Sequence, residues 1–284
     1  MEIPADVARL YHLTPLRHVA KTGIADIWHV RLPDGRDAAL KVYEARDPRD
    51  EAPGFDVMRT ADGSGAAQVF AYGDGVALLE WLDGPTLGDR VRAGNVATAD
   101  HDLVQTSQAM HAAITSVNRP LRSVRDWFEA LFAMTFDPSC PASLVADIRN
   151  CQQLARTLLA TEQVTRPLHG DYHHDNVKRG PNGYRAFDAK GVMGEAAFEA
   201  SNTFRNPLGA DDVIRDETRA MRLAEDWAIA TQTPQRRILQ WAAARGALSL
   251  AWSCSGHLTP DTEDLDLVPL YLRLAAAASP DTPR

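Results

Sequence analysis

The chain has 284 residues, of which 45% are hydrophobic and 24% are charged, and its formal net charge is −8. This length and apolar content are enough for a large buried core in one large domain or two lobes. The acidic balance argues against a broad surface for nucleic acid or anionic membranes. It is compatible with a cationic small substrate, although in many proteins acidity serves solubility alone.

The spacing of the cysteines and the length of the apolar runs limit the cellular compartments in which we expect the protein. Cys140, Cys151 and Cys254 form no CxxC pair, which argues against a disulfide framework and a cysteine-rich zinc site. The first residues, MEIPADVARL, lack the apolar centre of a signal peptide. The apolar run AAARGALSLAW is interrupted by Arg245 and is too short for a membrane span. We therefore expect a cytoplasmic protein with reduced cysteines and no membrane segment.

The first part of the chain has the pattern of an antiparallel sheet. Three segments combine β-branched and aromatic residues with partial alternation and are predicted strands: residues 15–22, 24–32 and 37–45. Turn residues at 33–35 join the second and third. Residues 53–65 predict a short helix that glycines stop, and residues 66–84 predict a hairpin about Gly73–Asp74–Gly75.

The pattern becomes helical after Pro85. Apolar residues lie three or four apart from 144 to 158, as on one face of a helix. Similar patterns occupy residues 101–114, 124–134, 216–230, 234–252 and 265–278. Two non-helical islands, 168–180 and 184–194, are joined by the turn sequence PNG. We predict an α+β fold with a small β-rich part, residues 1–82, and a larger helical part, residues 83–284.

The stretch LHGDYHHDN, residues 168–176, concentrates polar side chains that suit phosphoryl transfer. Such a reaction needs a carboxylate near the accepting hydroxyl, oxygen ligands for magnesium and a lysine for the phosphates. Asp171 and Asn176 lie five residues apart on this stretch, and Asp188 follows twelve residues later. These residues supply the first two requirements.

The lysine and the base-binding segment are expected in the first part. Lys41 lies in AALKVYE between apolar neighbours, where a lysine is poorly placed unless it reaches an anion. The alternative is an edge-strand lysine that points to water. Glu80, Trp81 and Leu82 lie where a strand leaves the small part, and their backbone groups are candidates to bind adenine. A buried strand end explains the same residues equally well.

The same residues are compatible with other kinds of site. His169, His173 and His174 with Asp171 and Asp175 could bind zinc, although adjacent histidines do not easily point the same way in a regular element. A solvated loop is a further alternative. No G-x4-GK[ST] phosphate loop and no G-x-S-x-G elbow occurs. Trp227, Trp241 and Trp252 are expected in the core, because they lie on helical faces. Cys140 and Cys151 are expected as buried filler.

The motifs in order resemble a known family. LHGDYHHDNV, then FDAKGVMGEAAFEASNTFRNP, resembles the aminoglycoside phosphotransferases, and within them the streptomycin 6-phosphotransferase and hydroxyurea phosphotransferase group. Upstream, RTADGSGAAQVFAYGDGVALLEWLDG resembles the same group. The likeness spans about residues 15 to 260. It implies a protein-kinase-like bilobal fold and a kinase that uses ATP and Mg²⁺.

The resemblance also implies roles for single residues. Asp171 would be the catalytic base, Asn176 and Asp188 would bind magnesium, and Lys41 would contact the nucleotide phosphates. His169 would shape the loop. The family has an acid that pairs with this lysine, and here both Glu51 and Asp56 are open, with Pro53–Gly54 expected to break the stretch between them. Lys190 and Lys178 are candidates to support charge on the γ-phosphate.

The expected acceptor is an aminoglycoside such as streptomycin, whose guanidinium groups need carboxylates. Acids of the helical part that could line its pocket are Glu195, Glu199, Asp211, Asp212, Asp216, Glu217, Glu225 and Asp226. Glu199 and Asp226 are preferred, and a solvated helix face is the alternative. Asn202 and Asn206 border the pocket or cap helices. Two other functions stay open: a kinase of hydroxyurea or another small metabolite, and a nucleotide-binding protein without turnover.

Overall fold

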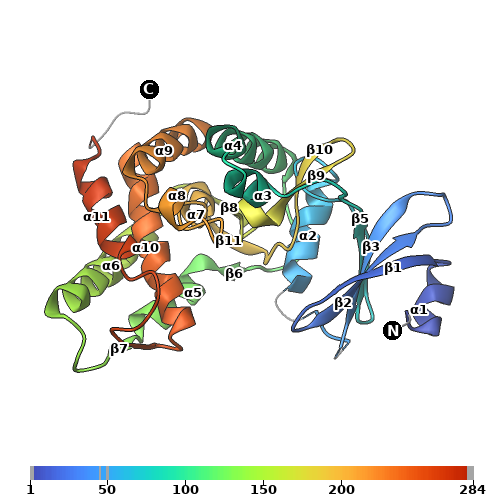
Figure 1. Cartoon of the computed structure of the whole chain (residues 1–284), viewed down its shortest axis with the longest axis horizontal. Helices are drawn as coiled ribbons and strands as arrows, with labels where there is room; N and C mark the ends of the chain where they lie inside the picture. Colours follow the sequence, from blue (N-terminus) through green and yellow to red (C-terminus); the bar gives the residue numbers. More distant parts are fainter. Residues whose placement is uncertain (1–2, 45, 49–50, 280–284) are drawn as a thin grey trace.

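The computed structural model describes residues 3–44, 46–48 and 51–279. A small lobe built on one sheet, from α1 to β5, joins a larger, mainly helical lobe, from α3 to α11 (Figure 1). The predicted α+β class is confirmed. Within the described part of the chain, no helix has the length and apolarity to cross a bilayer.

The small lobe contains an antiparallel sheet in the order β1-β2-β3-β5-β4. Its strands are β1 (Thr14–Lys21), β2 (Ala25–Arg31), β3 (Asp37–Tyr43), β4 (Val69–Gly73) and β5 (Val76–Glu80). The predicted strands and hairpin are therefore confirmed. Lys41 lies on the central strand β3, opposite Ile27 and Ala77, and is 7% exposed. The alternative of an edge lysine that points to water is wrong.

Two helices accompany the sheet instead of the one expected. α1 (Ala5–Leu10) places Val7 in a core cluster with Trp28, Val30 and Leu40. It was not predicted because its six residues bury only Val7, which gives no periodic apolar pattern.

The second helix, α2 (Ala52–Ala61), runs through Pro53 and Gly54 without a break. The expected break is wrong because proline fits the first turn of a helix, where its missing N–H has no partner to lose. Glu51 is the residue before the first helical position, and Asp62 ends the helix in the left-handed conformation. Val57 and Met58 of α2 belong to the core cluster of the large lobe, so this helix packs on both lobes.

The large lobe confirms the long predicted helices to within a few residues, except that α4 begins five residues earlier. Its helices are α3 (Leu87–Arg92), α4 (Val96–Ala113), α5 (Val124–Phe132), α6 (Ala142–Ala160), α7 (Ala196–Ser201), α8 (Asp211–Ile214), α9 (Glu217–Thr231), α10 (Gln235–Ser253) and α11 (Leu267–Ala277). The short helices α3, α7 and α8 were not predicted, since four to six residues are too few to establish a helical period. α10 is buried from Ile238 to Ala251 on nearly every side, and helices α5, α6, α7, α9 and α11 pack around it.

Short strands carry the polar islands to the boundary between the lobes. β6 (Arg122–Ser123), β11 (Val192–Glu195) and β8 (Thr165–Leu168) form a small sheet, and β7 (Thr135–Phe136) pairs with β12 (His257–Leu258). β9 (Val177–Gly180) and β10 (Gly183–Ala186) form the hairpin predicted at PNG. Ala67 of the small lobe donates its N–H to Ala186 at 2.9 Å.

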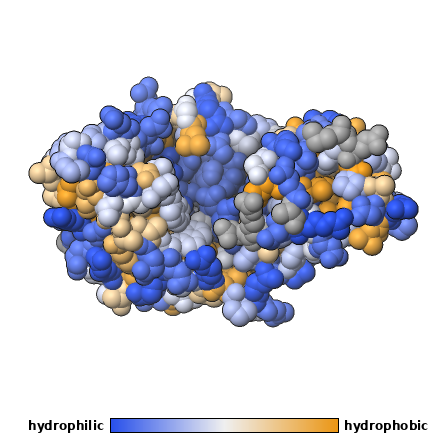
Figure 2. Space-filling model, turned by 90° about the horizontal axis from the view of Figure 1, so that it is seen from below, coloured by the Kyte–Doolittle hydropathy of each residue, from blue (hydrophilic) through white to orange (hydrophobic). Residues whose placement is uncertain are grey.

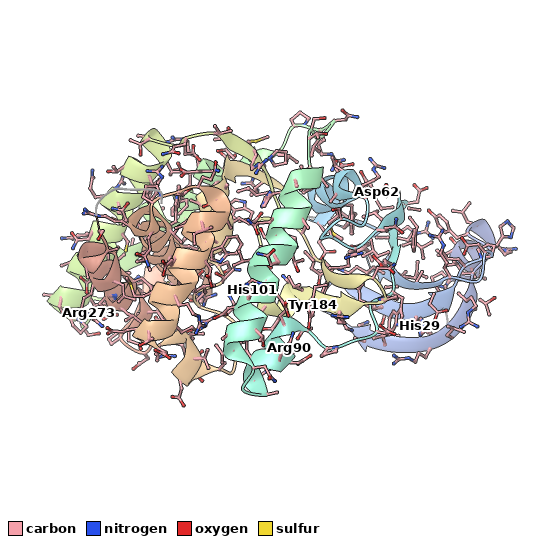
Figure 3. The ribbon with its side chains drawn as sticks, turned by 90° about the horizontal axis from the view of Figure 1, so that it is seen from above. His29, Asp62, Arg90, His101, Tyr184 and Arg273 are labelled. Carbon is pink, nitrogen blue, oxygen red and sulfur yellow. The ribbon has the colours of Figure 1, made fainter. Side chains whose placement is uncertain are left out.

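The β9–β10 hairpin is also fixed from the helical side. Arg90 of α3 donates to the Tyr184 hydroxyl at 2.7 Å and to Asp102 of α4 at 2.6 Å. Figure 3 labels Arg90 and Tyr184, which lie together. The hairpin is thereby held between α3, α4 and the small lobe, and residues 171–176 lead into it.

Candidate active site

The loop after β8 is built around a buried carboxylate. Glu199 of α7 accepts the backbone N–H groups of His169 at 2.7 Å and Gly170 at 3.0 Å. The imidazole Nε2 of His169 lies 2.9 Å from the carbonyl of Phe187. Gly170 has a φ of 84°, and a Cβ there would lie 3.0 Å from Trp127, so glycine is required for both reasons. These contacts fix the backbone that carries Asp171.

Asp171 is held by two amides. Asn202 donates to its Oδ1 at 3.0 Å, and Asn176 donates to its Oδ2 at 3.2 Å and to its carbonyl at 2.9 Å. Burial alone would raise the pKa of this carboxyl, but His173, Arg245, His169 and Lys190 together hold the pKa below its ordinary value. Asp171 is therefore an ionised carboxylate at neutral pH, able to accept a hydrogen bond from a hydroxyl.

A buried charge cluster anchors the same loop to the helices. His174, in the 3₁₀ turn η2 (His174–Asn176), lies 2.9 Å from Asp100 of α4. Arg219 of α9 contacts both oxygens of Asp100, at 3.0 and 3.2 Å, and Arg222 donates at 2.7 Å. Burial opposes ionisation of Asp100, but His174 and Arg219 keep its pKa well below the ordinary range.

Lys41 lies between two acids from different lobes. Its Nζ is 3.0 Å from Glu51 and forms a second, very short ion pair with Asp188. Burial alone would lower the pKa of Lys41, but Asp188 and Glu51 raise it above its ordinary value, so the ammonium stays charged. Asp188 has a φ of 60°. A left-handed aspartate is strained, and such residues concentrate at functional sites.

The choice between the two candidate partners of Lys41 falls on Glu51. The Tyr43 hydroxyl also donates to Glu51, at 2.5 Å, and fixes its position. Asp56 instead binds Arg59 at 2.7 Å, Arg119 at 3.2 Å and Tyr72 at 2.5 Å. Asp56 faces another side of α2, because five residues of a helix turn by about 500°, a net angle of about 140°.

In the connector between the lobes, the backbone N–H of Glu80 already has a partner. The backbone N–H of Glu80 donates to Gln68 at 2.8 Å, and its carboxylate accepts the N–H of Gln68. That N–H is therefore not offered to a nucleotide. Leu82 is buried at 6% exposure. Trp81 stacks on His29 of β2 with ring centroids 3.9 Å apart, and Lys178 lies 5.8 Å from its centroid.

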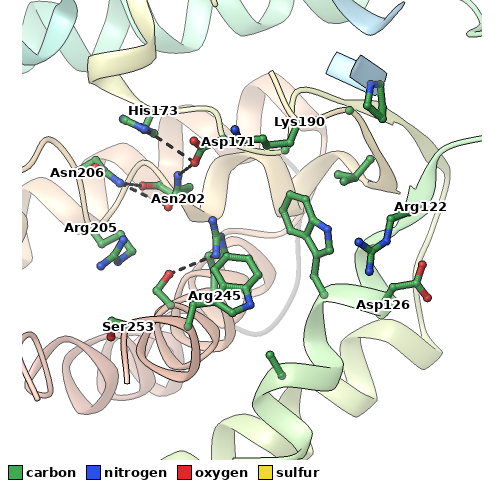
Figure 4. Close-up of a pocket in the computed structure, with 18 of the residues that line it drawn as sticks. Arg122, Asp126, Asp171, His173, Lys190, Asn202, Arg205, Asn206, Arg245 and Ser253 are labelled. Carbon is green, nitrogen blue, oxygen red and sulfur yellow. Dashed lines mark hydrogen bonds and ion pairs between the residues drawn. The ribbon is translucent and has the colours of Figure 1, made fainter. Parts of the chain in front are cut away.

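A cavity of about 880 Å³ opens beside Asp171. Seen from below, the molecule is hollowed between its two lobes, and hydrophilic side chains line the hollow (Figure 2). Asp171, Asn202 and Arg245 face the cavity together (Figure 4). Its charged lining consists of Arg122, Asp126, Asp171, Lys190, Arg205 and Arg245. Lys41, Asn176 and Asp188 do not line this cavity, but Lys190 does, and its Nζ lies 3.9 Å from Glu51, the partner of Lys41.

The expectation that acids of the helical lobe line the pocket is wrong. None of the eight proposed acids lines the cavity within the described residues. Glu199 holds the loop backbone, and Glu195 forms a bidentate pair with Arg237 at 2.6 and 2.7 Å. Asp216 caps α9, and Asp226 is not among the lining residues. Acids on helix surfaces and acids in a pocket have the same sequence pattern, so composition could not separate them.

Two further expectations about this region need correction. Trp227 and Trp241 are buried as predicted, but Trp252 is 42% exposed and lines the cavity. Arg245, noted in the sequence only as an interruption of an apolar run, lines it as well. A charged residue in the middle of a buried helix was the available signal, because arginine is rarely buried without a role.

The zinc alternative finds no support in residues 3–44, 46–48 and 51–279, where no group of three His, Cys, Asp or Glu side chains could hold a metal ion. His169 and His174 point to different partners, Phe187 and Asp100. The solvated-loop alternative is wrong too, since both side chains are 0% exposed. The three cysteines are free, and Cys151 is buried while Cys140 and Cys254 are half-buried.

Comparison with known proteins gives the class. A choline kinase from Streptococcus pneumoniae superposes with a TM-score of 0.63 at 10% identity and covers 96% of each chain. An amicoumacin kinase in complex with AMP-PNP, Ca²⁺ and Ami superposes with a TM-score of 0.61 at 15% identity, covering 95% of this chain and 90% of that one. The fold is thus that of the protein-kinase-like small-molecule kinases.

The family follows from sequence. Residues 10–256 match the model of the aminoglycoside/hydroxyurea antibiotic resistance kinases. A streptomycin 3''-kinase of Klebsiella pneumoniae is 34% identical over 220 residues, which cover 76% of this chain and 79% of that protein. The chain is a phosphotransferase with an alcohol group as acceptor, and it belongs to the aminoglycoside/hydroxyurea antibiotic resistance kinase family.

Proposed function

We propose that this phosphotransferase moves the γ-phosphate of ATP to a hydroxyl of a small molecule bound in the cavity beside Asp171. The observation that carries the proposal is that Lys41, Glu51 and Asp188 form one charged cluster, and that Asp171 lines a cavity together with Lys190, which lies 3.9 Å from Glu51. A nucleotide held by the Lys41 cluster and an acceptor held in the cavity would meet near the Asp171 carboxylate. The cytoplasm, where ATP is available, is the proposed location.

In the proposed step, the acceptor oxygen forms a bond to the γ-phosphorus while the bond from that phosphorus to the oxygen of the β-phosphate breaks. ADP leaves with the bonding electrons, and the hydroxyl proton passes to Asp171. Asn176 and Asn202 hold the two oxygens of Asp171 and so orient the base. Lys41 would bind the nucleotide phosphates, and Glu51 would keep its ammonium in position.

The donor atoms of Asn176 and Asp188 suit Mg²⁺. The amide nitrogen of Asn176 donates hydrogen bonds to Asp171, which leaves the Asn176 amide oxygen for a metal. The Asp188 side chain is 32% exposed. Oxygen ligands are those that magnesium prefers. When bound, Mg²⁺ would neutralise charge on the phosphate oxygens.

Lys190 is the better of the two candidates to stabilise charge on the γ-phosphate. It lines the cavity with Asp171 and lies 3.9 Å from Glu51. Lys178 instead lies beside Trp81 in the connector, where it and Leu82 would border the base of the nucleotide. The side chain of Glu80 is engaged with Gln68 and Arg185, so Glu80 would contribute to nucleotide binding through its carbonyl alone.

The acceptor is proposed from the family. Relationship alone suggests an aminoglycoside such as streptomycin, because of the 34% identical streptomycin 3''-kinase. The cationic lining of the cavity favours a second candidate, another small hydroxylated molecule that is neutral or anionic. Hydroxyurea, which the family description also names, belongs to the neutral group.

The test is a transfer assay with radiolabelled γ-phosphate of ATP and Mg²⁺, with streptomycin, hydroxyurea and a panel of sugars and hydroxy acids as acceptors. We expect a labelled product from at least one acceptor, dependent on Mg²⁺ and lost in Lys41→Met. ATP binding without transfer to any acceptor would instead support the nucleotide-binding protein without turnover.

A further inference from the structure

Arg245 is a buried cation without a carboxylate partner. Its exposure is 4%, yet it lines the cavity. Among the described residues, no carboxylate oxygen lies within 4 Å of its guanidinium, and its Nε has no hydrogen-bond partner. Its hydrogen bond in the described part of the chain runs from Nη1 to the Ser249 hydroxyl at 3.3 Å. An unpaired buried guanidinium is costly, because burial removes water without supplying a counter-charge.

The groups around Arg245 hold it without neutralising it. Its Cζ lies 4.5 Å from the ring centroid of Trp252 and 5.9 Å from that of Trp127. Aromatic faces attract a cation but carry no net charge. Burial, and then the neighbouring Arg205, lower the pKa of Arg245 to about 10, against the opposing effect of Asp171. The side chain is therefore still charged at neutral pH.

The other charges of the cavity add to the same potential. Arg122, Lys190 and Arg205 line it as well, and Arg205 is only weakly paired, with Asp264 at 3.8 Å. Two carboxylates also line the cavity, so the charged side chains that the structure describes there are four cations and two anions. Asp171 accepts from Asn176 and Asn202, and Asp126 accepts the N–H of Ser123 at the start of α5. The cavity thus concentrates positive charge around a polar space of molecular size.

We infer that Arg245, with Arg205 beside it, binds an anionic group of the acceptor, so that the natural acceptor is a hydroxylated small molecule carrying a carboxylate or a phosphate ester. Arg245 fixes this group on the α10 side of the cavity while Asp171 receives the hydroxyl (Figure 4). A planar guanidinium held beside two indole rings is arranged to bind either anion. A polycation such as streptomycin is repelled by the same charges.

The inference rests on the proposed phosphotransfer but is tested by binding. Two matched pairs of probes isolate the negative charge: gluconate against sorbitol for a carboxylate, and glycerol 3-phosphate against glycerol for a phosphate. Affinity is measured by calorimetry for the wild-type protein and for Arg245→Gln and Arg245→Lys. Arg236→Gln is the control, since Arg236 lies on the same helix outside this cavity.

For the wild type we expect the anion of at least one pair to bind about tenfold or more tightly than its neutral partner. The preference should disappear in Arg245→Gln, fall only partly in Arg245→Lys, and persist in Arg236→Gln. The pair that shows it identifies carboxylate or phosphate. ATP binding and the melting temperature of each variant verify that it is folded.

Equal binding within both pairs, or no binding by either, would overturn the inference. So would a preference that survives in Arg245→Gln, or a wild type that binds streptomycin more tightly than every anion. If Arg245 acted only on Asp171, its loss would reduce turnover equally for all acceptors and leave the binding preference unchanged. Failure of the proposed function is distinct, because it would appear as no ATP-dependent transfer while the anion preference persisted.

Discussion

The histidines of LHGDYHHDN show how neighbouring residues acquire different tasks. His169 contacts Phe187, His174 contacts Asp100, and His173 accepts the N–H of Asp175 beside Asp171. Burial lowers the pKa of all three and takes that of His173 to about 4. Each is therefore neutral at pH 7, and the loop is held by hydrogen bonds rather than by a metal.

This burial predicts an acid sensitivity of the fold. The ordinary histidine pKa is about 6.5, so between pH 6.5 and 4 the unfolded chain binds protons that the folded chain does not. The stabilising contribution is fully present above pH 6.5 and is lost as the pH falls toward 4, by about 3 kcal/mol for His173 alone. Urea unfolding at pH 7, 6 and 5 measures the slope. His173→Gln should flatten it and the exposed His257→Gln should not; an unchanged slope in both would contradict this.

The assignment of Glu51 as the partner of Lys41 gives a second prediction. Glu51→Gln removes the carboxylate 3.0 Å from Lys41, so we expect weaker ATP binding and turnover reduced by about tenfold or more, as for a buried ion pair worth at least 1.4 kcal/mol. Asp56→Asn, on the same helix but bound to Arg59 and Tyr72, should keep turnover within a few-fold. Steady-state kinetics against ATP measures both. The reverse order of the two variants would contradict the assignment.

At the scale of elements, the active-site loop depends on helices distant in sequence. Asp100 of α4 joins His174 to Arg219 of α9 with no exposure of its own. Asp100→Ala would leave Arg219 buried without a partner, which costs about 3–5 kcal/mol. Asp102→Ala, two residues away and paired with Arg90 near the surface, should cost about 1 kcal/mol or less. Urea unfolding measures the two free energies of unfolding. Equal losses in Asp100→Ala and Asp102→Ala would contradict the prediction.

A close approach of backbones joins α2 to the segment that carries Asp188. A Cβ on Gly54 would lie 1.8 Å from the carbonyl oxygen of Ala189, so Gly54→Ala must separate the two segments. We expect a loss of about 2 kcal/mol of stability and reduced turnover, because Glu51 and Lys41 move away from Asp188. Gly246→Ala, whose Cβ would meet only Val268 at 3.8 Å, should be neutral or stabilising. Unfolding and kinetics of this pair test the contact, and a stable, active Gly54→Ala would contradict it.

At the scale of the whole molecule, sequence predicted what is local or periodic. The strands of the small lobe, the long helices and the PNG hairpin followed from alternation, helical spacing and turn residues. The short helices α3, α7 and α8 were not predicted, since they span too few residues to show a helical period. The first turn of α2 was not predicted, because Pro53 fits there but would break a helix at an interior position.

The candidate site divides in the same way. Lys41, Asp171, Asn176 and Asp188 were marked by their types and spacing, and the fold brings Lys41 to Asp188 across 147 residues. The partner of Lys41 and the charge of the cavity depend on which way helix faces turn, which a residue list does not encode. Trp252 therefore had no distinguishing pattern, and the only signal for Arg245 was a charge within an apolar helix, although both residues line the cavity.

The convergence of both lobes on Asp171 is tested most directly by Asp171→Asn, measured for ATP affinity and for phosphate transfer on the same sample. Transfer should fall by about 10²- to 10⁴-fold, because the amide cannot take the proton, while ATP affinity stays within a few-fold. Asp175→Asn, on the same loop but paired with Arg92, should retain transfer. Wild-type transfer by Asp171→Asn would contradict the account.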